Sequence, residues 1–242
     1  MSGLAALAGF GRRAESLLAG GALLAMGILP VAEMTLRAIT GSGIPGLQGF
    51  VQHLTLWVAF VGAMLATRAG RHLTLSTGLK IFPDRIQHYG DMLAAAASTA
   101  VSAGLFWASY MFVKSQYDFS TGAGGHWLPA WVMQAILPLA FLVITIRLII
   151  QPTDRTVKLA AIAGALLTVV LIGIGMAIED GAVEYMVFPG WLVWPAVSAL
   201  FVAAVMGAPI FVVIGGAALL LFMGNDVPVA SVPVETYRIV VS

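Results

Sequence analysis

The side chain that stands out chemically is Glu33, a carboxylate inside an apolar run, with Arg37 four residues after it. A charge at the centre of a bilayer costs about 2.5–3.5 kcal/mol on insertion scales, so such a carboxylate usually faces protein or water. The spacing places both groups on one helix face, where an ion pair contributes about 0.2–0.5 kcal/mol in water. An ion pair at a membrane edge is therefore the favoured interpretation, and a contact with an ion or a partner is the alternative.

Four histidines raise the possibility of haem, because bis-histidine ligation needs two imidazoles at matched depth on facing helices. They are His53, His72, His88 and His126. All four lie near the ends of apolar runs, so interfacial or solvated imidazoles are the default interpretation. A haem- or quinone-binding anchor of a redox complex is the alternative function, and a visible absorption spectrum of the protein would distinguish it.

Residue patterns that enzymes require are missing from the sequence. It has no Gly-rich phosphate loop, no metal-spaced set of His, Asp and Glu, and no Ser–His–Asp arrangement. The absence of cysteine excludes disulfides, thiolate metal sites and a cysteine nucleophile. We therefore predict no catalytic, cofactor-binding or metal-binding residues; a membrane-embedded enzyme is the least favoured function.

Composition indicates the environment of the elements that hold these residues. Of the 242 residues, 60% are apolar and 10% carry a charge, whereas about a quarter are charged in a typical soluble domain. A soluble protein needs more polar residues to cover its surface, so lipid is the expected solvent. The formal net charge of +1 gives no reason to expect nucleic acid binding.

Seven apolar runs have, or approach, the length of about 20 residues that a membrane helix needs. They cover residues 17–36, 49–66, 92–113, 127–146, 159–178, 188–206 and 210–223. Backbone groups in hydrocarbon must be hydrogen-bonded within their own segment, so each run is predicted to be helical. The predicted fold class is an all-α membrane protein with about seven transmembrane helices.

Two of these runs carry more specific predictions. Pro138 should kink the fourth helix, because proline donates no backbone hydrogen bond. The last run, 210–223, reaches only about 21 Å at 1.5 Å per residue, short of a hydrocarbon core of ~30 Å. We expect it to be half-buried in the membrane or packed inside protein.

Basic residues are distributed unevenly between the loops, and cytoplasmic loops carry the excess of lysine and arginine. With a cytoplasmic N-terminus, nine lie inside: Arg12, Arg13, Arg68, Arg71, Lys80, Arg85, Arg147, Arg155 and Lys158. Three lie outside: Arg37, Lys114 and Arg238. We therefore predict a cytoplasmic N-terminus. A cleaved signal peptide is disfavoured, because the first run is longer than a typical signal core and no small-x-small cleavage site follows it.

The loop after the second run contains HLTLSTGLKIF at 72–82, which mixes apolar and basic residues. Such a mixture is typical of a segment that lies on the membrane surface. We predict an interfacial amphipathic stretch here, after helix two.

The order of several motifs resembles the small-permease (DctQ) family of tripartite ATP-independent periplasmic (TRAP) transporters. These motifs are Arg13-x-Glu15, Arg37, HLTLWVAFVGAMLATRAGRHLTL at 53–75, LPAWV from 128, LPLAF from 137, and Arg147 at the end of the fourth helix. The chain departs from many members in having Ala140 where they have glycine, and Gln48 and Gln52 where they have a carboxylate before the second helix.

The C-terminal part, 205–242, is similar to the second helix and following arm of the large-permease (DctM) subunit. In the family the small subunit ends inside and the large one begins outside, so a fusion of the two needs an extra crossing. The run 159–178 lies where that crossing belongs, and the distribution of basic residues orients it from inside to outside. We therefore expect a small-permease domain at 1–152, a connector at 153–186 and the start of a large-permease domain at 187–242.

The resemblance also implies a role and partners. In the family the substrate and sodium sites lie in the large subunit beyond this similarity, so the chain is expected to be incomplete as a transporter and to act as a scaffold. Expected partners are the large permease, or the remainder of a fused chain, a periplasmic substrate-binding protein and membrane lipid. The full system would import organic acids such as C4-dicarboxylates, driven by sodium, across the bacterial inner membrane. Candidate structural or interaction residues are Glu15, Glu33, Arg37, Arg71, His72 and Arg147.

Overall fold

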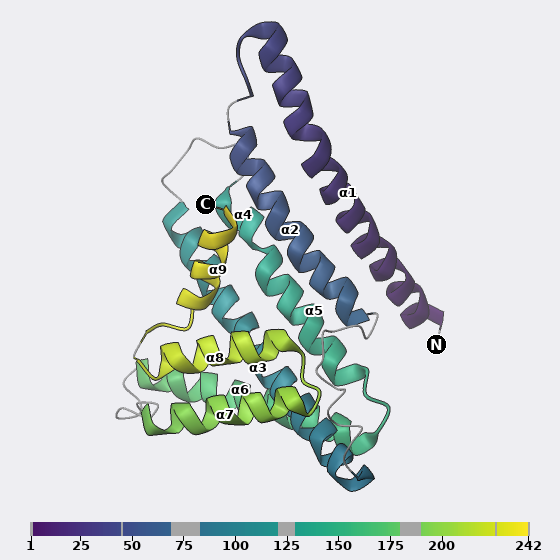
Figure 1. Ribbon diagram of the computed structural model, residues 1–242, viewed down its shortest axis with the longest axis vertical. Helices are drawn as coiled ribbons and strands as arrows, with labels where there is room; N and C mark the ends of the chain where they lie inside the picture. Colours follow the sequence, from purple (N-terminus) through teal and green to yellow (C-terminus); the bar gives the residue numbers. More distant parts are fainter. Residues whose placement is uncertain are drawn as a thin grey trace.

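A computed structural model shows a helical chain and describes residues 2–44, 46–68, 83–120, 129–179, 190–225 and 227–241 (Figure 1). Within them the helices are α1 (Ser2–Thr40), α2 (Leu47–Arg68), α3 (Asp84–Ser120), α4 (Ala130–Gln134), α5 (Ile136–Ile150), α6 (Arg155–Glu179), α7 (Gly190–Val205), α8 (Ile210–Met223) and α9 (Ser231–Val241). The predicted all-α class is confirmed. The predicted interfacial stretch at 72–82 lies outside the described residues.

Five of the expected seven runs form segments long and apolar enough to cross a membrane. These segments are Arg13–Thr40, Leu47–Arg68, Asp84–Phe119, Ala130–Ile150 and Arg155–Ile174. The sixth and seventh runs form shorter helices, α7 with 16 residues and α8 with 14 residues. At 1.5 Å per residue they reach about 24 Å and 21 Å, so neither matches the hydrocarbon thickness alone.

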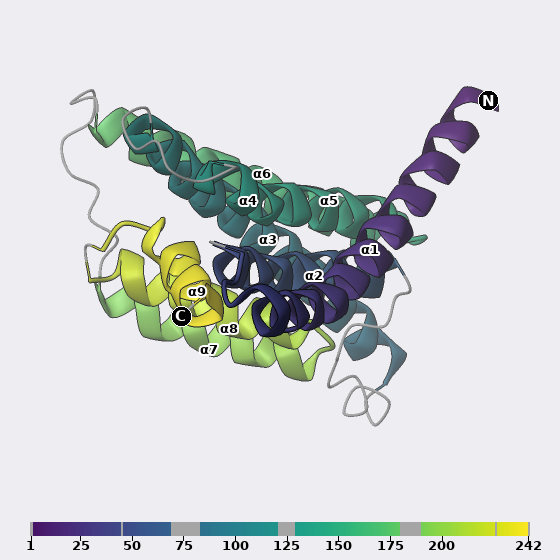
Figure 2. The same cartoon turned by 90° about the horizontal axis from the view of Figure 1, so that it is seen from above.

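Contacts between helices give their relative directions. Helices α1 and α2 are antiparallel, because Glu15 lies beside Arg68 and Met26 beside Thr55. Helix α2 and the α4–α5 segment are parallel, because Trp57 lies beside Met133 and Met64 beside Arg147. The Thr55 hydroxyl of α2 donates to the sulfur of Met26 near the middle of α1, at 3.5 Å. The Trp57 indole N–H donates to the Met133 carbonyl of α4 at 2.9 Å. Helix α1 lies at the edge of the molecule beside α2 (Figures 1 and 2).

The fourth predicted helix is broken, as expected from its proline. Pro138 has no N–H to donate to the carbonyl of Gln134, and the structure separates α4 from α5 at Ala135. The break is bridged by Ala135 N–H to the Trp131 carbonyl at 3.0 Å and Leu139 N–H to the Ala135 carbonyl at 3.3 Å. The disturbance expected from Pro138 thus takes the form of a break at Ala135, three residues before the proline.

Helix α6 packs closely along α3 and runs in the same direction. The Thr99 hydroxyl donates to the Ala161 carbonyl at 2.8 Å, and the Thr168 hydroxyl donates to the Ala100 carbonyl at 2.9 Å. A Cβ added at Gly164 would lie 2.2 Å from the Ala96 carbonyl oxygen. Small residues and interhelical hydrogen bonds of this kind hold membrane helices together, because lipid supplies no hydrophobic driving force between them.

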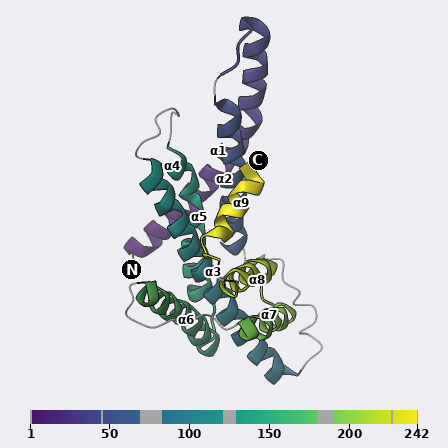
Figure 3. The same cartoon turned by 90° about the vertical axis from the view of Figure 1, so that its left-hand side faces the viewer.

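Helices α7 and α8 form a hairpin on the other side of α3 from α6 (Figures 2 and 3). Helix α7 ends at a left-handed glycine, Gly207, with φ of 100°. The Gly207 N–H bonds to the Ala204 carbonyl and the Ala208 N–H to the Ala203 carbonyl, the pattern of a Schellman cap. Pro209 then starts α8. A buried apolar core joins this hairpin to α3 and α9, and it includes Val101, Leu105, Leu200, Val212, Leu219 and Val232.

Candidate functional site

One carboxylate and two guanidinium groups join the N-terminal half of α1 to the C-terminal ends of α2 and α5, a cluster that we name the Glu15 junction. The Glu15 Oε1 atom accepts a hydrogen bond from Arg147 Nη2, and its Oε2 atom lies 3.8 Å from Arg68 Nη1. The Glu15 side chain is only 11% exposed and that of Arg147 is 19% exposed. The junction is therefore a largely buried ion pair with a second cation beside it.

The same end of α5 caps the C-terminus of α2. Arg147 Nη1 donates to the Met64 carbonyl at 2.5 Å, and Gln151 Nε2 donates to the Thr67 carbonyl at 2.8 Å. The Thr67 carbonyl lies in the last turn of α2, where carbonyls have no partner within the helix, and the Met64 carbonyl lies four residues before the end of α2 and gains a donor in addition to the helix. Cationic and amide donors from α5 thus satisfy the backbone of its neighbour while Arg147 also holds α1.

Sequence patterns proposed Glu15 and Arg147 as separate candidates, and the structure brings these two together across 132 residues. No spacing in the sequence reveals such a pair, because the two residues lie in different helices. Arg71 and His72, two further candidates, lie outside the described residues.

The predicted spacing of Glu33 and Arg37 forms an ion pair on α1. Arg37 Nη2 donates to Glu33 Oε1 at 2.6 Å, with the Arg37 side chain 66% exposed and that of Glu33 19% exposed. A shallow cavity of about 470 Å³ lies beside them, lined also by Met34, Ala38 and Gln48. The pair lies far along α1 from the Glu15 junction. That it stabilises the protein and takes no part in transport stays a prediction.

A contact that the sequence did not reveal fixes α9 to α2. The His53 ring lies with Nδ1 2.6 Å from the Gly49 carbonyl and Nε2 2.6 Å from the Tyr237 hydroxyl. A carbonyl can only accept, so Nδ1 carries a proton, and in the neutral imidazole Tyr237 therefore donates to Nε2. The amphipathic pattern of 227–242 was a signal for a docked helix, but not for its partner.

Helix α6 begins at a polar cap that faces α3. The Asp154 carboxylate accepts hydrogen bonds from the Thr156 N–H at 3.0 Å and from the Thr156 hydroxyl at 2.9 Å. These bonds favour the charged form, so the pKa of Asp154 lies below its ordinary value, and His88 on α3 contributes further at 3.4 Å. This is the arrangement of a side-chain N-cap.

The histidines do not form a haem pair in the part of the chain that the structure describes. Both ring nitrogens of His53 face partners within the chain, and those of His88 face Asp154 and Thr156. His72 and His126 lie outside the described residues. The described residues also contain no group of three or more His, Asp and Glu that could hold a metal ion.

Comparison with known proteins gives one family match. The family model for the DctQ component of tripartite ATP-independent periplasmic transporters matches residues 26–156, which is more than half of the chain. A comparison with individually curated proteins finds no match. The match covers the C-terminal part of α1 from residue 26 and all of α2–α5, so it includes Arg68 and Arg147 of the Glu15 junction but begins after Glu15 itself. The chain therefore belongs to the DctQ family and is a non-enzymatic, multi-pass component of a TRAP transporter in the bacterial inner membrane.

Proposed function

We propose that the chain is the small-permease scaffold of a sodium-driven TRAP transporter that imports organic acids. In this proposal residues 1–152 form the small-permease domain, 153–186 a connector and 187–242 the start of a large-permease-like unit. Its partners are a large-permease (DctM) component, which carries the substrate and sodium sites, and a periplasmic substrate-binding protein.

The observation that carries the scaffold role is that both carboxylates described in α1 are bound to arginines of the same chain. Glu15 is held by Arg147, with Arg68 close by, and Glu33 by Arg37. Each carboxylate must break its pair before it can bind an ion. For the buried Glu15 this costs several kcal/mol, whereas for Glu33, whose partner Arg37 is 66% exposed, the cost is small. The charges in these helices therefore support assembly better than they support transport chemistry.

The direction of α6 supports its role as a connector. Helix α6 runs parallel to α3, because His88 lies beside Thr156 and Ala100 beside Thr168. The α4–α5 segment before it runs antiparallel to α3, because Tyr117 lies beside Trp131 near its start and His88 beside Asp154 just after its end. A helix in this direction returns the chain to the side of the membrane on which α5 began. The excess of basic residues on one side supports a cytoplasmic N-terminus, so that α6 leads outward.

The surface of α1 suits a bilayer or a membrane-embedded partner. Only 6% of its apolar window is buried within the chain. Large exposed apolar side chains, such as Leu24, Ile28 and Val31, lie along it. In lipid such a face costs nothing to expose, and it leaves area for contact with a large permease.

Reconstitution in liposomes tests the proposal. The chain, a large permease and a binding protein should together accumulate a candidate organic acid under an inward sodium gradient. Omission of the chain should abolish uptake. Uptake by the chain and the binding protein without a large permease would show that the transport site lies in this chain and would contradict the scaffold role.

The same system separates stability from chemistry at Glu33. Glu33→Gln removes the charge that binds Arg37, so it should lower the yield of folded protein more than the uptake per molecule. Wild-type yield with abolished uptake would contradict this expectation and assign Glu33 to the transport step.

A further inference from the structure

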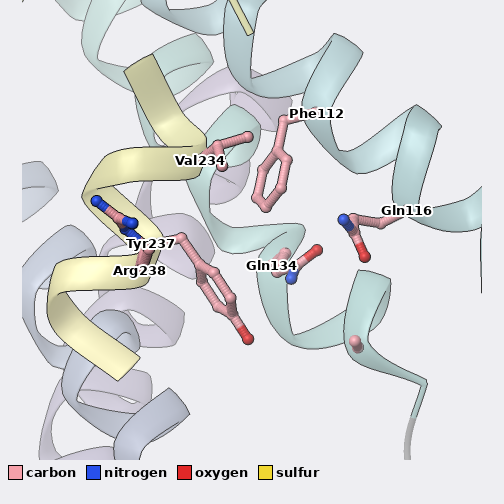
Figure 4. Close-up of a pocket in the computed structure, with 7 residues that line it drawn as sticks. Phe112, Gln116, Gln134, Val234, Tyr237 and Arg238 are labelled. Carbon is pink, nitrogen blue, oxygen red and sulfur yellow. The ribbon is translucent and has the colours of Figure 1, made fainter. Parts of the chain in front are cut away.

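A groove lies where α3, α4 and α9 meet, and the small-permease role does not account for it. Its volume is about 530 Å³, and it is lined by Phe112, Gln116, Ala130, Gln134, Val234, Tyr237 and Arg238. In Figure 4, the amides of Gln116 and Gln134 extend toward each other, and the Tyr237 ring lies on the opposite side of the groove, on α9. The groove thus combines amides with an apolar wall.

Gln134 supplies the strongest sign that the groove has an occupant. The residue is 2% exposed, and its Oε1 atom accepts no hydrogen bond. An acceptor buried without a partner costs about 1–3 kcal/mol. The break between α4 and α5 directly follows Gln134 and fixes its backbone. An occupant that donates a hydrogen bond would remove this cost.

The neighbouring side chains do not provide that donor. The Tyr237 hydroxyl donates to His53 Nε2 at 2.6 Å. The Arg238 guanidinium points away from the groove in Figure 4 and binds Glu235 at 2.6 Å on the exposed face of α9. Among the described residues, therefore, no hydrogen bond reaches Gln134 Oε1, and the Gln116 amide, which extends toward it in Figure 4, makes none with it.

The walls favour a donor that carries positive charge. The rings of Phe112 and Tyr237 have centroids 5.8 Å apart, and aromatic faces attract ammonium groups. None of the residues that line the groove is acidic, so recognition depends on the amide oxygen and the rings. Arg238 is 72% exposed and its pair with Glu235 contributes at most about 1 kcal/mol, so its guanidinium can turn from Glu235 toward an anionic group at the rim at little cost.

We propose that this groove binds the headgroup of an aminophospholipid, with the primary ammonium donating to Gln134 Oε1 beside the Phe112 and Tyr237 rings. The phosphate then lies toward Arg238 and the acyl chains follow the apolar side of the groove at Val234. A lipid is favoured over a soluble amine because α3 and the α4–α5 segment are both candidate membrane spans.

Thermal unfolding of the delipidated chain in detergent tests this inference without any transport assay. Dioleoyl phosphatidylethanolamine and dioleoyl phosphatidylcholine share their chains and phosphate, but only the first has N–H donors. The ethanolamine lipid at saturating concentration should raise Tm roughly 5 °C above the value with the choline lipid. Equal Tm values would overturn the recognition of an ammonium.

Variants identify the groove as the place of binding. The difference between the lipids should vanish in Gln134→Leu and persist in Gln134→Glu, which keeps an acceptor oxygen. It should also persist in Gln52→Leu, the same substitution on α2. Persistence in Gln134→Leu would overturn the assignment. If that variant does not fold, Phe112→Leu should at least halve the ratio of ethanolamine to choline lipid retained in native mass spectrometry, and an unchanged ratio overturns the assignment equally.

A soluble headgroup distinguishes the two sources of the ammonium. Millimolar phosphoethanolamine should leave Tm unchanged, because it lacks the acyl chains. A Tm shift as large as that given by the ethanolamine lipid would mean that the groove binds a soluble amine. It would overturn the assignment of a lipid as the occupant.

Discussion

At the scale of single residues, the ion pairs of this chain differ sharply in environment. Glu15 and Arg147 are 11% and 19% exposed, whereas Glu235 and Arg238 are 44% and 72% exposed. Water screens the exposed pair, and its contribution is small. Removal of one partner of the buried pair leaves a charge with poor compensation. The same two residue types are therefore expected to respond very differently to mutation.

Arg147→Ala should destabilise the chain by about 3 kcal/mol, because Glu15 loses its bound partner and the Met64 carbonyl loses a donor. This corresponds to a fall in Tm of roughly 10 °C, measured by tryptophan fluorescence in detergent. Arg147→Lys should recover only part of the lost stability, since one ammonium replaces a guanidinium that donates to two acceptors. Arg238→Ala is the matched control and should lower Tm by no more than a few degrees; equal losses would contradict the buried character of the junction.

Asp154→Ala should loosen the first turn of α6, because the Thr156 N–H loses its cap. Hydrogen exchange at Arg155–Lys158 should rise in this variant, and less in Asp154→Asn, which retains an acceptor oxygen. The pKa of Asp154 is lowered in the folded chain. The stabilising effect is therefore full above the ordinary pKa near 3.9 and is lost as pH falls through the lowered value. The wild type should approach the alanine variant only in that acidic range, after correction for intrinsic exchange rates.

At the scale of helices, the contact of α6 with α3 depends on a residue without a side chain. Gly164 brings the α6 backbone against Ala96, and two threonine hydroxyls bond across the same interface. The opposing atom at Gly164 is a backbone oxygen, which cannot turn aside as a long side chain can. The distance between these helices is thus set by one position.

Gly164→Ala should therefore cost about 2 kcal/mol through overpacking, although alanine ordinarily favours a helix over glycine. Gly173→Ala on the same helix is the control, since a Cβ there meets nothing within 4 Å. The control should leave Tm unchanged or slightly raised. A Gly164→Ala protein as stable as the Gly173→Ala protein would show that α3 and α6 are not in close contact.

The hydropathy and proline patterns predicted where the helices lie better than they predicted where each helix ends and which helices contact each other. The break before Pro138 and the short α8 follow from local rules of backbone bonding and length. Helix α3 begins at Asp84, eight residues before its predicted apolar run. A helix can continue beyond the membrane with polar residues, and hydropathy gives no signal for those turns. The pairing of Glu15 with Arg147 and of His53 with Tyr237 depends on tertiary packing, which no pattern within one helix encodes.

At the scale of the whole molecule, α3 is the central element. Helix α6 covers one side of it and the α7–α8 hairpin the other, while α9 reaches from α8 to α2 (Figures 2 and 3). The region matched by the DctQ family and the region after it are thus packed into one body through α3 and α9.

The orientation of this body is testable because the chain has no cysteine. Ser120→Cys should react with a membrane-impermeant maleimide in intact cells, and Ser76→Cys should react only after the membrane is opened. The expectation rests on the excess of basic residues in the loop that contains Ser76. Labelling of Ser76→Cys alone from outside would reverse the predicted topology.

Arg147 donates to two acceptors, a side chain and a backbone carbonyl, that constrain the sequence differently. Its bond to Glu15 depends on the side chain at that position, so substitutions at 15 and 147 should be correlated among relatives. Its bond to α2 reads the backbone carbonyl of Met64, which every amino acid possesses. Position 64 is then free to drift among apolar residues that fill its buried space. Contact maps inferred from co-variation should detect the α1–α5 contact here and miss the α2–α5 contact made by the same guanidinium.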